Sequence, residues 1–249
     1  MKQLPNFFTL LNLVFGCVAI IYIFKDGDSL LFSNKPGDFS FGLMIGGVYI
    51  FLAAVVDFLD GFIARLMHAS SEMGAQLDSL CDAVTFGVAP GMIMYRLLEL
   101  ALSRNGMAPD NIGYLLPALL IPCCAVWRLA KFNLDKEQTY YFKGVPSPAA
   151  GLTIASLPFI VGGDNSFWEG VVLNPYVLYG ITVVVSLLMV VNLPLISLKF
   201  KNFSVKSNIE KLILLLIGIV AIIFLRWAAV PVIFVSYVLV SLIFKPGKI

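Results

Sequence analysis

Long apolar runs are the feature that most constrains the fold of this chain. Stretches of about 20 mainly hydrophobic residues recur along the sequence, and a helix of that length crosses the hydrocarbon core of a bilayer. Only 13% of the 249 residues are charged, about half the share that is typical of soluble domains. So few charges cannot cover a water-exposed surface. The sequence therefore predicts an all-α, polytopic membrane protein with a single domain over residues 1–249.

The apolar runs predict about eight transmembrane helices. These lie near residues 7–24, 39–66, 75–102, 112–132, 147–163, 174–192, 209–225 and 227–244. The first run follows Lys2 and has no small-residue cleavage site after it, so we expect a retained span. Lys and Arg gather in the loops on one side of this arrangement. The positive-inside rule then places both termini on the cytoplasmic face of the cell (inner) membrane.

Four aspartates stand beside the hydrophobic runs, where ionisable side chains are costly and usually functional. Asp57 and Asp60 are three positions apart near the end of the second run, and Asp78 and Asp82 are four apart after a short polar turn. Each pair therefore shares one face of a helix. Because the turn is short, the two helices should be antiparallel neighbours. The four carboxylates are thus predicted to converge at the cytoplasmic end of this helix pair.

Carboxylates packed together in a low dielectric repel one another unless cations neutralise them. Mg²⁺ and Mn²⁺, hard ions that prefer oxygen ligands, are the natural partners, and a metal pair can bind a diphosphate and stabilise charge at phosphorus. Gly61, Ala64 and Gly74 keep the nearby surface low enough for a flat base or a diphosphate to approach. The ion pathway of a transporter would also explain paired acids, but not these small residues or Arg65.

The spacing of these residues resembles the signature of the CDP-alcohol phosphotransferase family, D-x2-D-G-x2-A-R-x8-G-x3-D-x3-D. Its fixed positions correspond to Asp57, Asp60, Gly61, Ala64, Arg65, Gly74, Asp78 and Asp82. The resemblance implies a homodimeric membrane enzyme in which an alcohol attacks the lipid-linked phosphorus of a CDP-lipid and CMP leaves.

The resemblance also implies a role for each residue of the motif. Asp57, Asp60 and Asp78 would hold a pair of Mg²⁺ or Mn²⁺ ions. Asp82 would act as the general base for the attacking hydroxyl and would also contact a metal ion. The CDP group would be framed by Gly61, Ala64, Arg65 and Gly74.

Three further stretches are similar to one branch of the family, in which CDP-diacylglycerol is the donor and L-serine the acceptor. They are residues 4–13, 127–133 and 142–150. This similarity implies transfer of a phosphatidyl group to L-serine, with membrane lipids as surroundings and no nucleic-acid partner. Inositol phosphate or glycerol 3-phosphate as acceptor, and an archaeal ether lipid as donor, stay open.

A zwitterionic acceptor requires a cation or a helix N-terminus for its carboxylate. The candidates are Arg128, Lys131, Lys143, Gly144, Pro146 and Ser147, because the turn at residues 144–148 could start a helix. Ordinary helix-start chemistry and a cytoplasmic anchor explain the same residues without a substrate. On the first span, Asn6 and Asn12 either cap a helix or contact the nucleotide.

Overall fold

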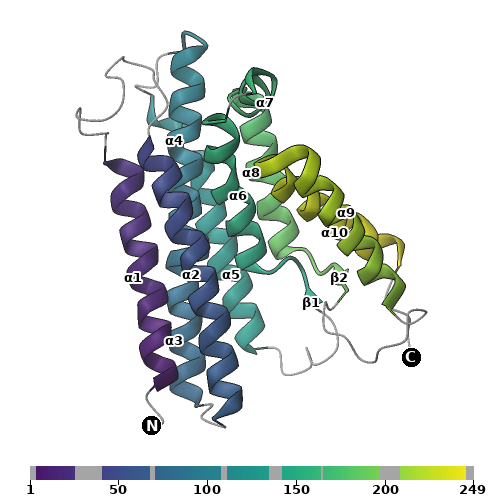
Figure 1. The fold of residues 1–249 in the computed structure, drawn as a ribbon. Coiled ribbons are helices and arrows are strands. Elements are labelled where there is room, and N and C mark those ends of the chain that lie inside the picture. Colours follow the sequence, from purple (N-terminus) through teal and green to yellow (C-terminus); the bar gives the residue numbers. More distant parts are fainter. Residues whose placement is uncertain are drawn as a thin grey trace.

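The computed structural model describes residues 4–25, 41–67, 71–107, 111–134, 142–163, 165–196 and 208–244. Almost all of these residues are helical, which confirms the all-α prediction. Helices pack side by side as a bundle, and a further pair of helices leans against one flank of it (Figure 1).

The bundle contains the first eight α-helices. They are α1 (Leu4–Phe24), α2 (Phe41–Leu66), α3 (Glu72–Asp82), α4 (Ala89–Arg104), α5 (Leu120–Leu134), α6 (Ser147–Val161), α7 (Ser166–Val172) and α8 (Pro175–Val190). A π-helical segment, η1 (Ala83–Val88), joins α3 to α4, and two 3₁₀ turns, η2 (Ile112–Tyr114) and η3 (Leu116–Leu119), precede α5. The Asn174-Pro175 pair starts α8, with the Asn174 side chain accepting a hydrogen bond from the Tyr176 N–H.

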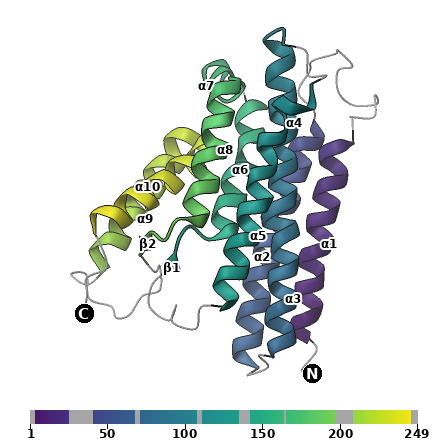
Figure 2. The ribbon, with the colours of Figure 1, turned by 180° about the vertical axis from the view of Figure 1, so that it is seen from behind.

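The flanking pair consists of α9 (Ile209–Leu225) and α10 (Ala229–Ile243), which are joined by the 3₁₀ turn η5 (Arg226–Ala228). The two helices pack against each other, and α10 also contacts α6. Seen from behind, they still lie to one side of the bundle (Figure 2). Two short strands, β1 (Phe142–Lys143) and β2 (Pro194–Leu195), pair antiparallel and connect the segment before α6 with the segment after α8.

Among the described residues, four helical stretches are long and apolar enough to cross a bilayer. They are Pro5–Phe24, Phe41–Leu66, Glu72–Arg104 and Ile209–Ile243, and the pair α7–α8, bent by 64°, makes a fifth if it counts as one span. Helices lie over each of the eight predicted segments, but α5 and α6 have only 15 residues each. The chain is therefore an all-α protein with four or five candidate membrane spans, whereas eight transmembrane helices stay a prediction.

The helix that carries the second pair of aspartates changes from α to π geometry directly after Asp82. Two neighbouring helices approach this π segment very closely. A Cβ atom on Gly16 of α1 would lie 2.4 Å from Thr85 Oγ1, and one on Gly151 of α6 would lie 3.0 Å from the Phe86 carbonyl oxygen. Single π turns inside α-helices often mark functional sites. Here the contacts with α1 and α6 fix the end of α3, and with it the position of Asp82.

Candidate active site

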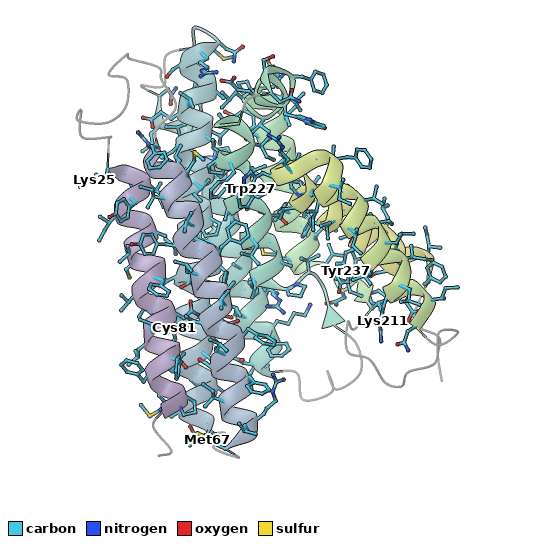
Figure 3. The ribbon with its side chains drawn as sticks, in the orientation of Figure 1. Lys25, Met67, Cys81, Lys211, Trp227 and Tyr237 are labelled. Carbon is cyan, nitrogen blue, oxygen red and sulfur yellow. The ribbon has the colours of Figure 1, made fainter. Side chains whose placement is uncertain are left out.

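Three of the four predicted aspartates meet at one end of the bundle. Carboxylate oxygens of Asp57 on α2 and of Asp78 and Asp82 on α3 all lie within 4.8 Å of one another. Asp82 is 7% exposed, and the other two are half-buried. Cys81, next to Asp82, lies above Met67 at the end of α2 in the view of Figure 3. We call Asp57, Asp78 and Asp82 the acidic cluster.

Asp60 lies outside this set of three and is held by α1. The Thr9 hydroxyl donates a hydrogen bond to Asp60 Oδ2, and it also lies 3.1 Å from the Pro5 carbonyl oxygen. Both Thr9 and Asp60 are buried. The sequence analysis gave Thr9 no role. The available signal was its spacing from Asn12, because polar residues three apart in an apolar helix share one face.

Asn12 on α1 contacts the acidic cluster directly. Its Nδ2 atom donates a hydrogen bond to Asp82 Oδ1 at 3.2 Å, and the Asn12 side chain is fully buried. The Thr85 hydroxyl donates to the Asn12 carbonyl oxygen, also at 3.2 Å, which ties the same turn of α1 to η1. Neither of the two sequence-based interpretations of Asn12, a helix cap or a nucleotide contact, included this bond to the aspartate.

Arg128 on α5 links the cluster to the start of α6. Its guanidinium Nη1 donates to Ser147 Oγ at 3.2 Å, its charge interacts with that of Asp82, and it lies 5.5 Å from the centroid of the Phe132 ring. Arg128 is 8% exposed and Ser147 is fully buried. A buried guanidinium needs such hydrogen bonds and a nearby negative charge to offset the loss of its hydration. Of the predicted serine-binding residues, the structure therefore brings Arg128 and Ser147 together, with Arg128 within electrostatic range of Asp82.

The turn before α6 is fixed against the end of α8. Gly144 has a φ of +84°, a conformation that favours glycine, and a Cβ there would lie 2.8 Å from the Met189 carbonyl oxygen. The Gly144 N–H donates to the Leu193 carbonyl oxygen at 2.9 Å. Pro146 then leads into α6, which begins at Ser147. The prediction that this turn starts a helix is confirmed.

Of the two predicted lysines, the structure describes the side chain of Lys131 alone. Lys131 Nζ donates to Asn192 Oδ1, in the segment after α8. The backbone of Lys143 forms part of β1, and its side chain lies outside the described part of the structure.

The small residues of the motif border the cluster in two different ways. No atom lies within 4 Å of a Cβ built on Gly61, so this side of α2 faces open space. The Gly74 N–H donates to Ser71 Oγ at 3.0 Å in the capped first turn of α3. Ala64 is half-buried and Arg65 is exposed at the end of α2. The surface of α2 beside Gly61 is thus open to an approaching group.

The acidic cluster suits a hard divalent cation. Its ligand atoms are carboxylate oxygens from two helices, close enough for one ion or a neighbouring pair to bridge them. It offers no thiolate or imidazole of the kind that softer metals prefer. The donor set therefore fits Mg²⁺ or Mn²⁺.

Comparison with known proteins places the chain in a family. Residues 2–191 match the model of the family described as CDP-alcohol phosphatidyltransferase. The CDP-diacylglycerol–serine O-phosphatidyltransferase of Bacillus subtilis strain 168 is 35% identical over 159 residues, which are 64% of this chain and 77% of that protein. The protein of the same name from Helicobacter pylori strain J99 is 30% identical over 226 residues, 89% of this chain and 81% of the relative.

An archaeal protein is also similar. The CDP-diacylglycerol–serine O-phosphatidyltransferase of Methanocaldococcus jannaschii is 30% identical over 151 residues, which are 61% of this chain and 58% of the relative. The helical fold, the apolar spans and the acidic cluster agree with the membrane transferases to which these relatives belong. The chain belongs to the CDP-alcohol phosphatidyltransferase family. It is therefore an enzyme, and this membership replaces the transporter interpretation of the aspartates.

Proposed function

We propose that this enzyme transfers the phosphatidyl group of CDP-diacylglycerol to L-serine and releases phosphatidylserine and CMP. The convergence of Asp57, Asp78 and Asp82 within 4.8 Å is the observation that carries the proposal. The names of the bacterial and archaeal relatives support serine as the acceptor. The charge of Arg128, which acts on Asp82, supports it further, because a carboxylate-bearing acceptor needs a cation near the base.

The reaction is a displacement at the lipid-linked phosphorus. The serine hydroxyl oxygen forms a bond to this phosphorus, and the bond from phosphorus to the CMP oxygen breaks, so that CMP leaves with the electron pair. Asp82 takes the hydroxyl proton as general base. Asn12, through its bond to Asp82 Oδ1, holds the carboxylate in one orientation.

Metal ions complete this chemistry. Asp57, Asp60, Asp78 and Asp82 would hold a pair of Mg²⁺ or Mn²⁺ ions, with Thr9 orienting Asp60 from α1. When bound, such ions neutralise the diphosphate and stabilise the charge that develops at phosphorus.

The two substrates approach from different sides of the cluster in this proposal. The CDP group lies over the open side of α2 and the first turn of α3, framed by Gly61, Ala64, Arg65 and Gly74. The serine carboxylate binds between Arg128 and the start of α6 at Ser147, with Gly144 and Pro146 shaping the turn. Lys131 and Lys143 would contribute positive charge at the entrance.

We further propose a membrane arrangement that the sequence favours. The single domain crosses the cell membrane eight times, with the active site and both termini in the cytoplasm, and the enzyme is a homodimer. The loop charges support this orientation, because the predicted topology assigns most loop Lys and Arg residues to the same side as the motif aspartates.

CMP release by the purified protein in detergent tests the proposed reaction. The protein is supplied with CDP-diacylglycerol, Mn²⁺ or Mg²⁺, and one of L-serine, glycerol 3-phosphate, inositol phosphate or no acceptor. Release that requires both serine and metal supports the proposal, and Asp82→Asn should lower it between about 10² and 10⁴-fold. Release with another acceptor would overturn the serine assignment but keep the family chemistry.

A further inference from the structure

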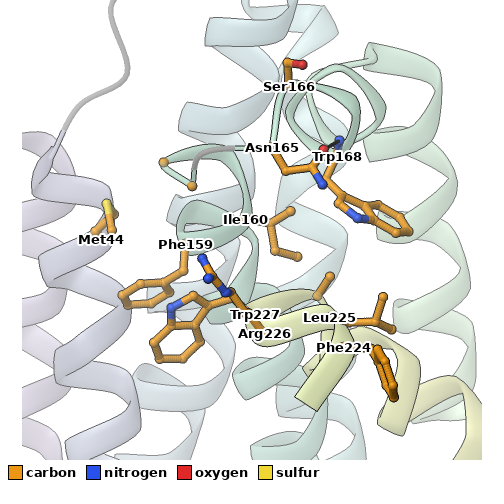
Figure 4. A pocket seen from close by; sticks show the side chains of 13 residues that line it. Met44, Phe159, Ile160, Asn165, Ser166, Trp168, Phe224, Leu225, Arg226 and Trp227 are labelled. Carbon is orange, nitrogen blue, oxygen red and sulfur yellow. Dashed lines mark hydrogen bonds between the residues drawn. The ribbon is translucent and has the colours of Figure 1, made fainter. Parts of the chain in front are cut away.

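A cavity of about 690 Å³ opens beside the turn between α9 and α10 (Figure 4). Its described lining residues come from the start of α2, the end of α6, residues 162, 163 and 165, the helix α7, the end of α9 and the turn η5. Met44 lines the cavity near the start of α2, whereas Asp57 lies near the end of this helix. At 1.5 Å per residue the two positions are roughly 20 Å apart along α2. The cavity is therefore separate from the active site.

One wall of the cavity is aromatic and apolar. The rings of Phe159 and Trp227 stack with their centroids 4.3 Å apart, and Phe51 packs against Trp227 at 6.0 Å. Ile160 and Leu225 extend this wall. The volume lies within the range of roughly 300–1,000 Å³ that is usual for binding pockets of organic ligands. The wall thus suits an apolar group of considerable size.

The only charged side chain among the described lining residues is Arg226. It forms no ion pair with any described residue, whereas the nearby Arg104 is paired with Glu169 at 2.5 Å. Arg226 points toward Phe159, beside the Trp227 indole (Figure 4). Among the described residues, the cavity therefore combines one cation with an aromatic wall.

Arg226 also has an unusual backbone conformation. Its φ is +50°, the one positive φ among the described non-glycine residues. Such conformations are strained for residues other than glycine and concentrate at functional sites. At this position the strained residue ends α9, begins the turn to α10 and carries the cation of the cavity.

We propose that this cavity binds an anionic phospholipid, with its phosphodiester on Arg226 and its glycerol and upper acyl chain against Phe159 and Trp227. A guanidinium matches phosphate oxygens in charge and geometry. Free phosphate shares that chemistry but would leave the apolar wall uncovered. The source is the bilayer itself, because only 17% of the Ile209–Ile243 stretch is buried, so that α9 and α10 face lipid.

The bound lipid would not be the donor substrate. The donor phosphorus must reach the acidic cluster, and the cavity lies at the other end of α2, in the opposite leaflet of a bilayer that the bundle crosses. The site would instead hold a structural lipid that connects α9 and α10 to α6. This inference is independent of the identity of the acceptor alcohol.

Native mass spectrometry of the purified full-length protein tests the proposal. The protein is titrated with dioctanoyl phosphatidylglycerol, dioctanoyl phosphatidylcholine or inorganic phosphate. We expect one saturable phosphatidylglycerol adduct and at least about tenfold weaker binding of it in Arg226→Gln, the factor that loss of a charged hydrogen bond implies. Arg104→Gln is the matched control, an exposed arginine at the same end of the bundle that should leave binding unchanged.

A second variant tests whether the lipid needs the space of the cavity as well as the charge of Arg226. Ser166 is exposed and lines the cavity, so Ser166→Phe should fill part of it and weaken the adduct while Arg226 is retained. Both variants should release CMP at the rate of the unmodified enzyme, which shows that they fold. Equal binding of phosphatidylcholine, full competition by inorganic phosphate, or unchanged binding in Arg226→Gln would each overturn the proposal.

Discussion

Asn12 on α1 and Asp82 at the end of α3 are joined by a hydrogen bond of 3.2 Å, although they are far apart in the sequence. This bond places the first helix of the protein in contact with the proposed general base. Thr9, one helical turn before Asn12, holds Asp60 in a similar way. The first helix therefore positions two of the four motif aspartates, one on each of the two helices that carry them.

Replacing Asn12 tests whether it positions Asp82. Asn12→Ala should lower kcat for CMP release by about 10 to 100-fold, because hydrogen bonds to charged groups contribute about 1.5–3 kcal/mol. If Asn12 acts through Asp82, the same change in an Asp82→Asn background should have almost no further effect. Asn105→Ala, at the C-terminal end of α4, is the control and should leave kcat unchanged. Fully additive losses in the double variant would contradict the coupling.

The hydroxyl of Thr9 is the feature that matters for Asp60. Thr9→Val keeps the shape of the side chain but removes the donor, so that a buried carboxylate loses its hydrogen bond. We expect a lower affinity for Mn²⁺ and a loss of activity of about tenfold. Thr9→Ser retains a hydroxyl and should restore most of both. The Mn²⁺ affinity can be measured by electron paramagnetic resonance of the free ion, and equal values for the Val and Ser variants would contradict this role.

The acidic motif and the helix start before Ser147 could be predicted because their signals are local. The spacing of Asp57, Asp78 and Asp82 places them on facing helix surfaces, and a short turn makes those helices neighbours. The roles of Thr9 and Asn12 could not be predicted in this way. Their partners are distant in the sequence, and an apolar helix with two polar residues does not indicate which neighbour they will meet.

The π segment after Asp82 also escaped sequence analysis. Residues 83–88 have no composition that distinguishes a π from an α turn, and the geometry depends on tertiary contacts with α1 and α6. The number of membrane crossings is also hard to predict from the sequence, for a related reason. Hydropathy locates apolar segments, but it does not show that α7 and α8 are bent by 64°.

Gly16 should be intolerant of even a methyl group. In Gly16→Ala the new Cβ would lie 2.4 Å from Thr85 Oγ1 and 3.0 Å from Thr85 Cα, and the backbone atom cannot rotate away. We expect overpacking to lower the free energy of unfolding by about 1–3 kcal/mol. Gly180→Ala on α8 is the control, because nothing lies within 4 Å of its Cβ and alanine favours a helix. Thermal unfolding in detergent distinguishes the two, and equal stability of the two variants would contradict the close packing of α1 on η1.

We expect Arg128 to affect the KM for L-serine more strongly than the KM for CDP-diacylglycerol. Arg128→Lys keeps the charge but loses the fixed geometry of the bond to Ser147 Oγ, so we expect the KM for L-serine to rise by about tenfold. The KM for CDP-diacylglycerol should change little. Lys131→Gln is the comparison, since Lys131 bonds to Asn192 and not to the acidic cluster, and its effect should be smaller. A rise in the KM for the lipid alone would assign Arg128 to the donor site instead.

Removal of one carboxylate should separate metal binding from folding. In Asp78→Asn the acidic cluster keeps its shape but loses one of three charged ligands, so the affinity for Mn²⁺ should fall by at least about tenfold. The stabilisation that the unmodified enzyme gains from Mn²⁺ in a thermal unfolding experiment should then disappear at the same ion concentration. Without metal, Asp78→Asn should be at least as stable as the unmodified protein, because one source of repulsion between buried carboxylates is gone.

Glu99→Gln, in an ion pair with Arg96 on α4, is the matched control and should leave Mn²⁺ binding unchanged. If Asp78→Asn bound Mn²⁺ as tightly as the unmodified enzyme, the acidic cluster would not be the metal site, and the proposed placement of the diphosphate would have to be abandoned.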